Sequence, residues 1–122
     1  MSLTGKQGLL MKPINDFFST KKNIKRIIPI LNGENKISLR IIDWFVTNYS
    51  KKKNISYNVN NLQFTVYLSY KSQLKAFSKK QFDPFCRRER INFKYKDIVI
   101  NTTVGQLNFF KWALENKILN YI

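Results

Sequence analysis

The chain has 122 residues, and its 22 lysines and arginines outweigh 7 acidic residues to give a net charge of +15. This length suits one compact domain, and 43% hydrophobic with 15% aromatic residues is enough for a packed core, which excludes a wholly disordered chain. The charge exceeds what solubility requires and predicts a polyanionic partner. The lack of histidine and the single cysteine, Cys86, exclude histidine-dependent catalysis, an intramolecular disulfide and cysteine-based zinc motifs.

No apolar segment approaches the roughly 20 residues that cross a bilayer, and the N-terminus lacks the apolar region of a signal peptide. We therefore expect a soluble protein that is not secreted and has no transmembrane segment. The composition also predicts neither a cofactor nor a small-molecule substrate.

Residues 1–36 have no sustained periodicity and contain glycines and prolines, so we expect a basic, partly extended arm before a single domain over residues 37–122. An apolar patch at residues 27–31 docks on this domain or adds an edge strand, and a turn follows at Asn32-Gly33. The basic run of the arm either tracks a phosphate backbone or is simply solvated. This run consists of Lys21, Lys22, Lys25 and Arg26.

Ser38 is a candidate N-cap for a helix whose apolar residues recur at helical spacing. Ile41 and Trp44 widen the apolar face, so we expect this helix to be largely buried. The lysines at residues 51–53 follow its end. They either complement the helix dipole or contact phosphate, and the sequence favours neither.

Residues 55–59 and 62–69 alternate between apolar and polar side chains, which predicts a β-hairpin. Asn60-Asn61 suits the two-residue turn, since asparagine tolerates positive φ. Pairing Val59 with Leu62 puts the apolar residues of both strands on one face. The same register pairs Tyr57 with Phe64 and Ile55 with Val66.

The densest run of cations lies between residues 70 and 96. If residues 70–80 form a helix, lysines at i, i+4 and i+8 share one ridge, and Leu74 and Phe77 face the opposite way. Like charges at this spacing repel one another, so such a ridge favours a bound anion. The predicted ridge consists of Lys71, Lys75 and Lys79, with Lys80 beside it.

An Asp83-Pro84 pair must end this helix. Three arginines follow within a few residues, and their guanidinium groups suit phosphate oxygens. We expect the lysine ridge and this arginine cluster to share one surface. The cluster consists of Arg87, Arg88 and Arg90.

A second hairpin is predicted around Lys96-Asp97. Its register places Tyr95 opposite Ile98, and the polar residues of its first strand then share the outer face. That outer face consists of Arg90, Asn92, Lys94 and Lys96.

Residues 103–122 predict the last helix, with Thr103 and Gln106 as a capping box. Phe109 and Trp112 lie off its main apolar stripe, where they cover the sheet edge or meet a second copy of the chain. The predicted fold is α+β: the two hairpins join in a small antiparallel sheet packed with three helices.

Three segments carry a resemblance to a known group of proteins: residues 41–49, 83–90 and 102–112. They resemble segments of small basic proteins encoded by nucleocytoplasmic large DNA viruses, including mimivirus-like giants. The similarity extends from about residue 37 to the C-terminus. It implies a virion-associated protein that coats or compacts the packaged genome without being a histone.

We interpret the basic rows as contacts to the phosphate backbone of double-stranded DNA, because each neutralised phosphate releases counterions. The competing interpretation is a uniformly basic surface without a defined site. The predicted nucleic-acid-binding residues are Lys71, Lys75, Lys79, Lys80, Arg87, Arg88, Arg90, Lys94 and Lys96, together with Lys21, Lys22, Lys25 and Arg26 of the arm.

Aromatic residues near the basic run are typical of base-stacking proteins, but core packing is the favoured role in so small a domain. These residues are Tyr67, Tyr70, Phe82 and Phe85. Asp83, Glu89 and Asp97 have the chemistry to bind Mg²⁺, yet a turn, a local ion pair and a hairpin position explain them better. We therefore do not expect an enzyme.

The leading hypothesis is a sequence-independent architectural DNA-binding protein in the virion core and the viral factory of the host cytoplasm. Compaction requires bridging, so we expect a homo-oligomer with more than one basic face. One alternative is a minor capsid or core protein that binds an acidic partner. Another is a regulatory factor that binds RNA.

Overall fold

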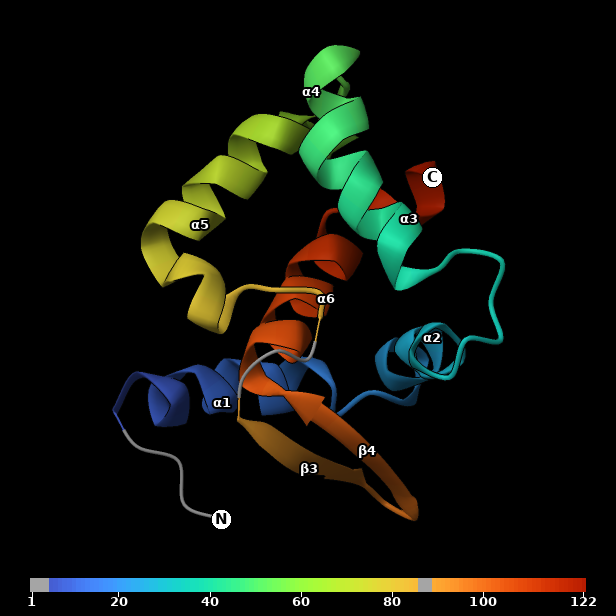
Figure 1. Ribbon diagram of the computed structural model, residues 1–122, viewed down its shortest axis with the longest axis vertical. Coiled ribbons are helices and arrows are strands. Elements are labelled where there is room, and N and C mark those ends of the chain that lie inside the picture. Colours follow the sequence, from blue (N-terminus) through green and yellow to red (C-terminus); the bar gives the residue numbers. More distant parts are fainter. Residues whose placement is uncertain (1–4, 86–88) are drawn as a thin grey trace.

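A computed structural model describes residues 5–85 and 89–122. The N-terminal half contains α1 (Gly5–Phe17), α2 (Lys21–Leu31), α3 (Leu39–Trp44), the π-helix η1 (Phe45–Tyr49) and α4 (Ser50–Lys52). The remainder contains β1 (Ser56–Val59), β2 (Leu62–Thr65), α5 (Val66–Gln81), β3 (Arg90–Tyr95), β4 (Ile98–Thr103), α6 (Val104–Glu115) and α7 (Ile118–Tyr121). The α+β class is confirmed, and Figure 1 shows α6 at the centre between α5 and α2.

The extended N-terminal arm is not confirmed, because residues 5–31 form α1 and α2. Ile14 and Phe18 are fully buried, as are Ile24 and Ile27 of α2. These residues recur at helical spacing, and their burial offsets the cost of Pro13 and Pro29 inside the helices. The apolar patch thus docks as a helix face rather than as an edge strand. A turn does follow it, with φ of +72° at Gly33.

The helix expected from Ser38 is present but irregular. Ser38 caps it as predicted, since its Oγ accepts from the amide of Ile41 at 3.1 Å. The chain then passes through α3, the π-turn η1 and α4 without leaving the helical region. Ile42, Phe45 and Val46 are buried. The outer side is more exposed than predicted, with Trp44 at 50% exposure.

The first hairpin has the predicted register, with Val59 opposite Leu62 and positive φ at both turn asparagines. Its second strand is shorter than expected, because α5 begins at Val66. Val66 and Tyr70 are buried one turn apart, and Leu74 continues the same spacing. A helical period therefore starts inside the segment that looked like an alternating strand.

The second hairpin also has the predicted register, with Phe93 opposite Ile100 and Tyr95 opposite Ile98. The two hairpins do not join in one sheet within the described residues. Each forms its own two-stranded ladder, and β3–β4 lies beside α1 at one end of the molecule (Figure 1). Helices rather than strand pairing therefore connect the two hairpins.

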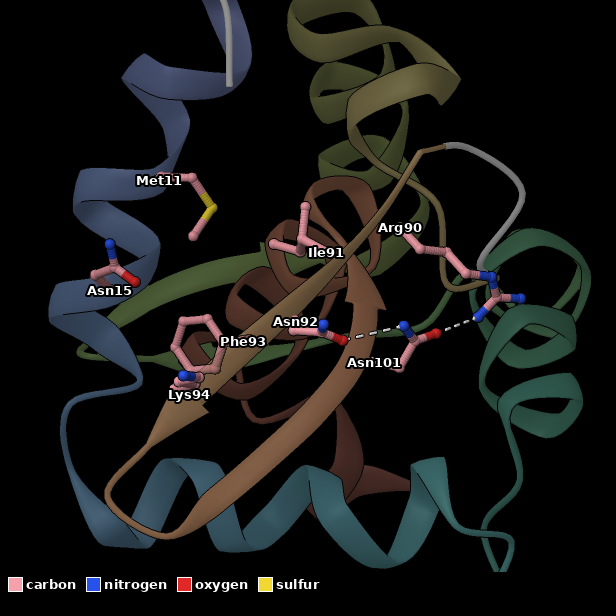
Figure 2. A pocket seen from close by; sticks show the side chains of 8 residues that line it. All are labelled: Met11, Asn15, Arg90, Ile91, Asn92, Phe93, Lys94 and Asn101. Atoms are coloured by element: carbon pink, nitrogen blue, oxygen red, sulfur yellow. Dashed lines mark hydrogen bonds between the residues drawn. The ribbon is translucent and has the colours of Figure 1, made fainter. Parts of the chain in front are cut away.

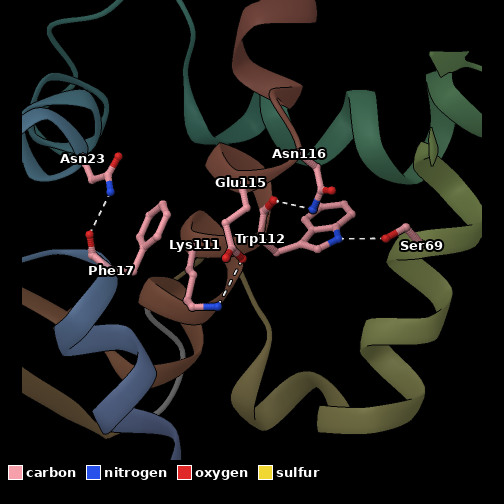
Figure 3. Close-up of polar contacts among 7 residues, drawn as sticks. All are labelled: Phe17, Asn23, Ser69, Lys111, Trp112, Glu115 and Asn116. Carbon is pink, nitrogen blue, oxygen red and sulfur yellow. Dashed lines mark hydrogen bonds and ion pairs between the residues drawn. The ribbon is translucent and has the colours of Figure 1, made fainter. Parts of the chain in front are cut away.

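Helix α6 forms the centre of the core. Thr103 caps it, with its Oγ1 accepting from the amide of Gln106 at 3.0 Å, and Phe109 and Phe110 are fully buried. The predicted helix over 103–122 breaks at Lys117, whose φ is +56°, and resumes as α7. Trp112 donates from Nε1 to Ser69 Oγ at 2.9 Å, which joins α6 to α5 (Figure 3). Phe109 and Trp112 therefore pack inside their own chain.

Several polar contacts connect the segment after α5 to the first turns of α6. Asn108 Nδ2 donates to the carbonyl of Gln81 at 2.8 Å, and Gln106 Nε2 donates to that of Pro84 at 2.7 Å. A Cβ on Gly105 would lie 3.1 Å from the carbonyl oxygen of Lys80, so a larger residue here would require the backbone to shift by a few tenths of an ångström. We call this contact between residues 80–84 and α6 the seam.

Candidate nucleic-acid interface

The predicted lysine ridge on α5 is only partly present. Lys71 and Lys75 are exposed one turn apart, and Leu74 and Phe77 pack toward the core as expected. Ser78 has φ of +64° and ψ of 169°, which kinks the helix before Lys79. Because the kink changes the direction of the chain, Lys79 and Lys80 do not continue the row. They remain exposed at the end of α5.

A contact between α4 and α5 extends the row in the other direction. The Nζ of Lys51 lies 5.4 Å from the centre of the Tyr67 ring, a cation–π distance. Tyr67 precedes Lys71 by one helical turn. A line of side chains therefore runs from Lys51 across Tyr67 to Lys71 and Lys75, and we call it the α4–α5 row.

Neither α4 nor α5 contains an acidic residue. Lys52 and Lys53 are exposed beside Lys51, so the end of α4 adds two further cations near the row. From the sequence, these lysines had either a helix-capping or a phosphate-contacting role. Their position near α5 was not predictable, because the cation–π contact joins residues on separate elements.

The polar face of β3 is a second basic surface. Arg90 donates from Nη1 to Asn101 Oδ1 at 2.9 Å, and Asn101 donates from Nδ2 to Asn92 Oδ1 at 3.3 Å (Figure 2). Arg90 and Lys94 are exposed on this outer face, as predicted. A hollow of about 360 Å³ separates it from Met11 and Asn15 of α1.

Lys96 does not extend this second row. It has φ of +52° at the hairpin turn, and its Nζ lies 5.5 Å from the ring centre of Tyr95. The β3 face also lies at the end of the molecule away from α4 (Figure 1). Because Arg87 and Arg88, which would link the lysine ridge to β3, lie outside the described residues, the expected single surface from the ridge to Lys96 stays a prediction.

The four cations of the predicted arm form a third surface, on α2. They are exposed on the side of the helix opposite Ile24 and Ile27. Arg26 donates from Nη2 to Asn120 Oδ1 at 2.9 Å, which ties this face to α7. The face consists of Lys21, Lys22, Lys25 and Arg26. Figure 1 places α2 and α5 on opposite sides of α6.

Two predicted residues, Arg87 and Arg88, lie outside the described residues, as does Cys86. Asp83 is buried, and its Oδ1 accepts from the amide of Phe85 at 3.1 Å, which agrees with its predicted role in a turn. In the described part of the chain, no cluster of three histidine, cysteine or acidic side chains is placed to hold a metal ion. No helix among the same residues is long and apolar enough to cross a membrane.

The aromatic residues considered for base stacking are mostly internal. Tyr70 and Phe82 are buried, and Tyr67 and Phe85 are half-buried. Trp44 is 50% exposed, although it was expected to lie on a buried helix face. The interruption of that face by the π-turn carries no clear sequence signal.

A model of a family of unknown function, DUF7197, matches residues 3–122. The chain belongs to this family. An uncharacterized protein of Acanthamoeba polyphaga mimivirus, L507, is 43% identical over 130 residues, which cover 98% of this chain and 50% of L507. This similarity supports a giant-virus origin, and the chain corresponds to about half the length of that relative. No solved structure matches the chain.

Proposed function

We propose that this viral protein binds double-stranded DNA through its phosphate backbone, without sequence preference, and helps to condense a viral genome. The observation that carries the proposal is the α4–α5 row, in which Lys51, Lys71 and Lys75 line a surface built from two helices without acidic residues. Lysines in such a row attract phosphates and release counterions, but they carry no base-specific information. The proposal includes no catalytic step.

Two basic faces on one chain also support condensation. Helices α2 and α5, which carry the α2 face and the two α5 lysines of the α4–α5 row, lie on opposite sides of α6 (Figure 1). A protein that binds a duplex on each side bridges two segments of DNA, so compaction does not depend on an oligomer. The place of action that we propose is the virion core and the viral factory in the host cytoplasm.

The test measures binding to a short duplex of random sequence by fluorescence anisotropy at several salt concentrations. Replacing Lys71 and Lys75 by glutamate is expected to weaken binding at about 50 mM salt by about tenfold or more, and to reduce the salt slope by about 2. The control replaces Lys12 and Lys36, two exposed lysines outside the basic faces, and changes the net charge equally. Its effect is expected to be much smaller.

A second measurement follows condensation of long DNA by light scattering. The exchange of Lys22 and Lys25 for glutamate on the α2 face should leave the α4–α5 row able to bind a short duplex, but should reduce scattering from long DNA. If the unaltered protein ignores the duplex at low salt, DNA binding is refuted. If both charge-reversed pairs weaken duplex binding equally, the assignment to the α4–α5 row is refuted.

A further inference from the structure

We infer that the surface around Trp44 is a second binding site, which takes an unpaired nucleobase together with its neighbouring phosphate. This goes beyond the proposed function, because duplex DNA offers phosphates but keeps its bases stacked inside. The site joins the exposed Trp44 and the half-buried Tyr49 to the three lysines at residues 51–53. Its ligand class is single-stranded nucleic acid.

Trp44 is the exposed one of the two tryptophans in the chain. Half of its surface faces solvent, whereas Trp112 is only 5% exposed and hydrogen-bonded to Ser69. An indole is a large apolar surface, and leaving it in water forgoes the stabilisation that burial would bring. Indole rings also stack on nucleobases of any sequence, since every base has a π-face.

The π-turn explains how the aromatic pair forms. The amide of Ser50 donates to the carbonyl of Phe45, a spacing of five residues. In an α-helix, residues five apart point about 140° away from each other, so Trp44 and Tyr49 would lie on different sides. Across η1, the ring centres of Trp44 and Tyr49 are 5.2 Å apart, with the planes tilted by 43°. Such π-turns occur frequently at functional sites.

The aromatic pair rests on the core. The Tyr49 ring stacks on that of Phe45, with centres 5.7 Å apart and planes at 25°. Phe45 is 4% exposed, so the support of Tyr49 is itself buried. Trp44 thus has an ordered neighbour on the protein side, and its orientation does not need to be fixed at the moment of binding, which lowers the entropic cost.

The space beside the pair suits a nucleotide. A surface hollow of about 760 Å³ lies there, within the usual size range of small-ligand sites. Asn48 is exposed in this hollow and provides an amide for hydrogen bonds to a base edge. The hollow is lined by Trp44, Thr47, Asn48, Tyr49, Lys51, Lys52 and Lys53.

The charge of the hollow selects an anion. Lys51, Lys52 and Lys53 are all exposed, and the helix dipole of so short an end segment does not require three cations. Lys51 also belongs to the α4–α5 row through Tyr67. A strand whose base stacks on Trp44 therefore has a cationic path for its backbone toward Lys71. An uncharged protein partner would instead bury these lysines without compensation.

The experiment uses the fluorescence of the full chain with an oligothymidine of about ten nucleotides, within the usual site sizes of single-strand binders. The chain has two tryptophans, and the buried Trp112 contributes a steady background. We expect the single strand to quench Trp44, and a blunt duplex of equal length to bind without quenching. If a saturating concentration of the single strand does not quench the Trp44 fluorescence, the proposed site is refuted.

Substitution separates the two ligands. Anisotropy of labelled oligothymidine should show Trp44→Leu weakening single-strand binding by about 5- to 100-fold, the range for loss of one stacked base. Duplex affinity should stay within about twofold, since phosphate contacts remain. Tyr49→Leu is a second variant that removes the neighbour of the indole. The control is Val99→Ala, which trims an apolar side chain that is 57% exposed on β4.

The outcomes also separate this inference from the proposed function. If the unaltered protein quenches with the single strand but does not bind duplex, the proposed function fails and the base site stands. If Trp44→Leu weakens both ligands equally, or neither, the base site fails while duplex binding stands.

Discussion

Trp112 on α6 is 5% exposed, whereas Trp44 at the end of α3 is 50% exposed. Around Trp112, polar and aromatic groups of α6 contact α5 and the seam, and their hydrogen bonds are made inside the protein. Around Trp44, a π-turn holds two rings at the surface beside lysines. The difference indicates that α6 supplies stability, whereas η1, α4 and α5 form the surface that we propose for binding.

The polar groups of the two regions follow the same division. Gln106 is 1% exposed, and its side chain bonds to Thr102 and to the carbonyl of Pro84. Lys71 and Lys75 instead project into solvent from a helix without acids. Substitutions in the first region should therefore lower the free energy of unfolding, and those in the second should leave it nearly unchanged while weakening nucleic-acid binding.

The largest effect on stability is expected from Phe110→Ala. Phe110 is fully buried at the centre of the core, so truncation leaves a cavity and should lower the free energy of unfolding by about 3–5 kcal/mol. Urea unfolding followed by circular dichroism measures this loss. The matched change on the proposed binding surface, Lys71→Ala, should alter the free energy of unfolding by no more than about 0.5 kcal/mol. Similar losses in both variants would contradict the division between the two regions.

Gly105→Ala should have a smaller but diagnostic effect. In an exposed helix, alanine is favoured over glycine by about 1 kcal/mol. At the seam, the new Cβ would lie 3.1 Å from the Lys80 carbonyl oxygen and 3.3 Å from Phe82 N, both backbone atoms that cannot move alone. We therefore expect destabilisation by about 1–3 kcal/mol, measured by the same unfolding experiment. If the free energy of unfolding is unchanged or higher, the backbone at the seam can shift to admit the new Cβ at little cost.

Much of the fold follows from local patterns in the sequence. The alternation of apolar and polar residues predicted the register of both hairpins. The side chains of Ser38 and Thr103 predicted the two helix caps. The helices α1 and α2 were missed because Pro13 and Pro29 argue locally against a helix. Only burial in the finished core, which is a tertiary effect, reveals why they are tolerated.

The candidate site was less predictable than the fold. Lys71 and Lys75 were found because helical spacing places them on one face. The kink at Ser78, which removes Lys79 from the row, and the π-turn that exposes Trp44 are departures from regular helix geometry. A prediction from periodicity assumes regular helix geometry throughout, so it cannot locate either departure. The approach of Lys51 to Tyr67 likewise requires the packing of α4 against α5.

Tyr57 offers the smallest of these tests, because it links the first hairpin to the end of α6. Its hydroxyl donates to the carbonyl of Asn116 at 2.8 Å, and its ring stacks on Tyr121 with centres 4.9 Å apart. Burial, together with the neighbouring charge of Tyr121 when that residue ionises, raises the pKa of Tyr57 from 10.0 to about 12. The folded protein therefore holds this proton more tightly than the unfolded chain does.

The sign of the pH effect follows from that raised pKa. The stability that the protonated Tyr57 provides is fully present below pH 10 and is lost as the pH rises toward about 12. Tyrosinate absorbance should show Tyr57 titrating late, and this titration should be absent from Tyr57→Phe. The same variant should cost about 0.5–1.5 kcal/mol near neutral pH through the lost hydrogen bond. It should also lose less stability than the unaltered protein between pH 10 and 12, and because both proteins share every lysine, an equal loss would exclude Tyr57 as the cause.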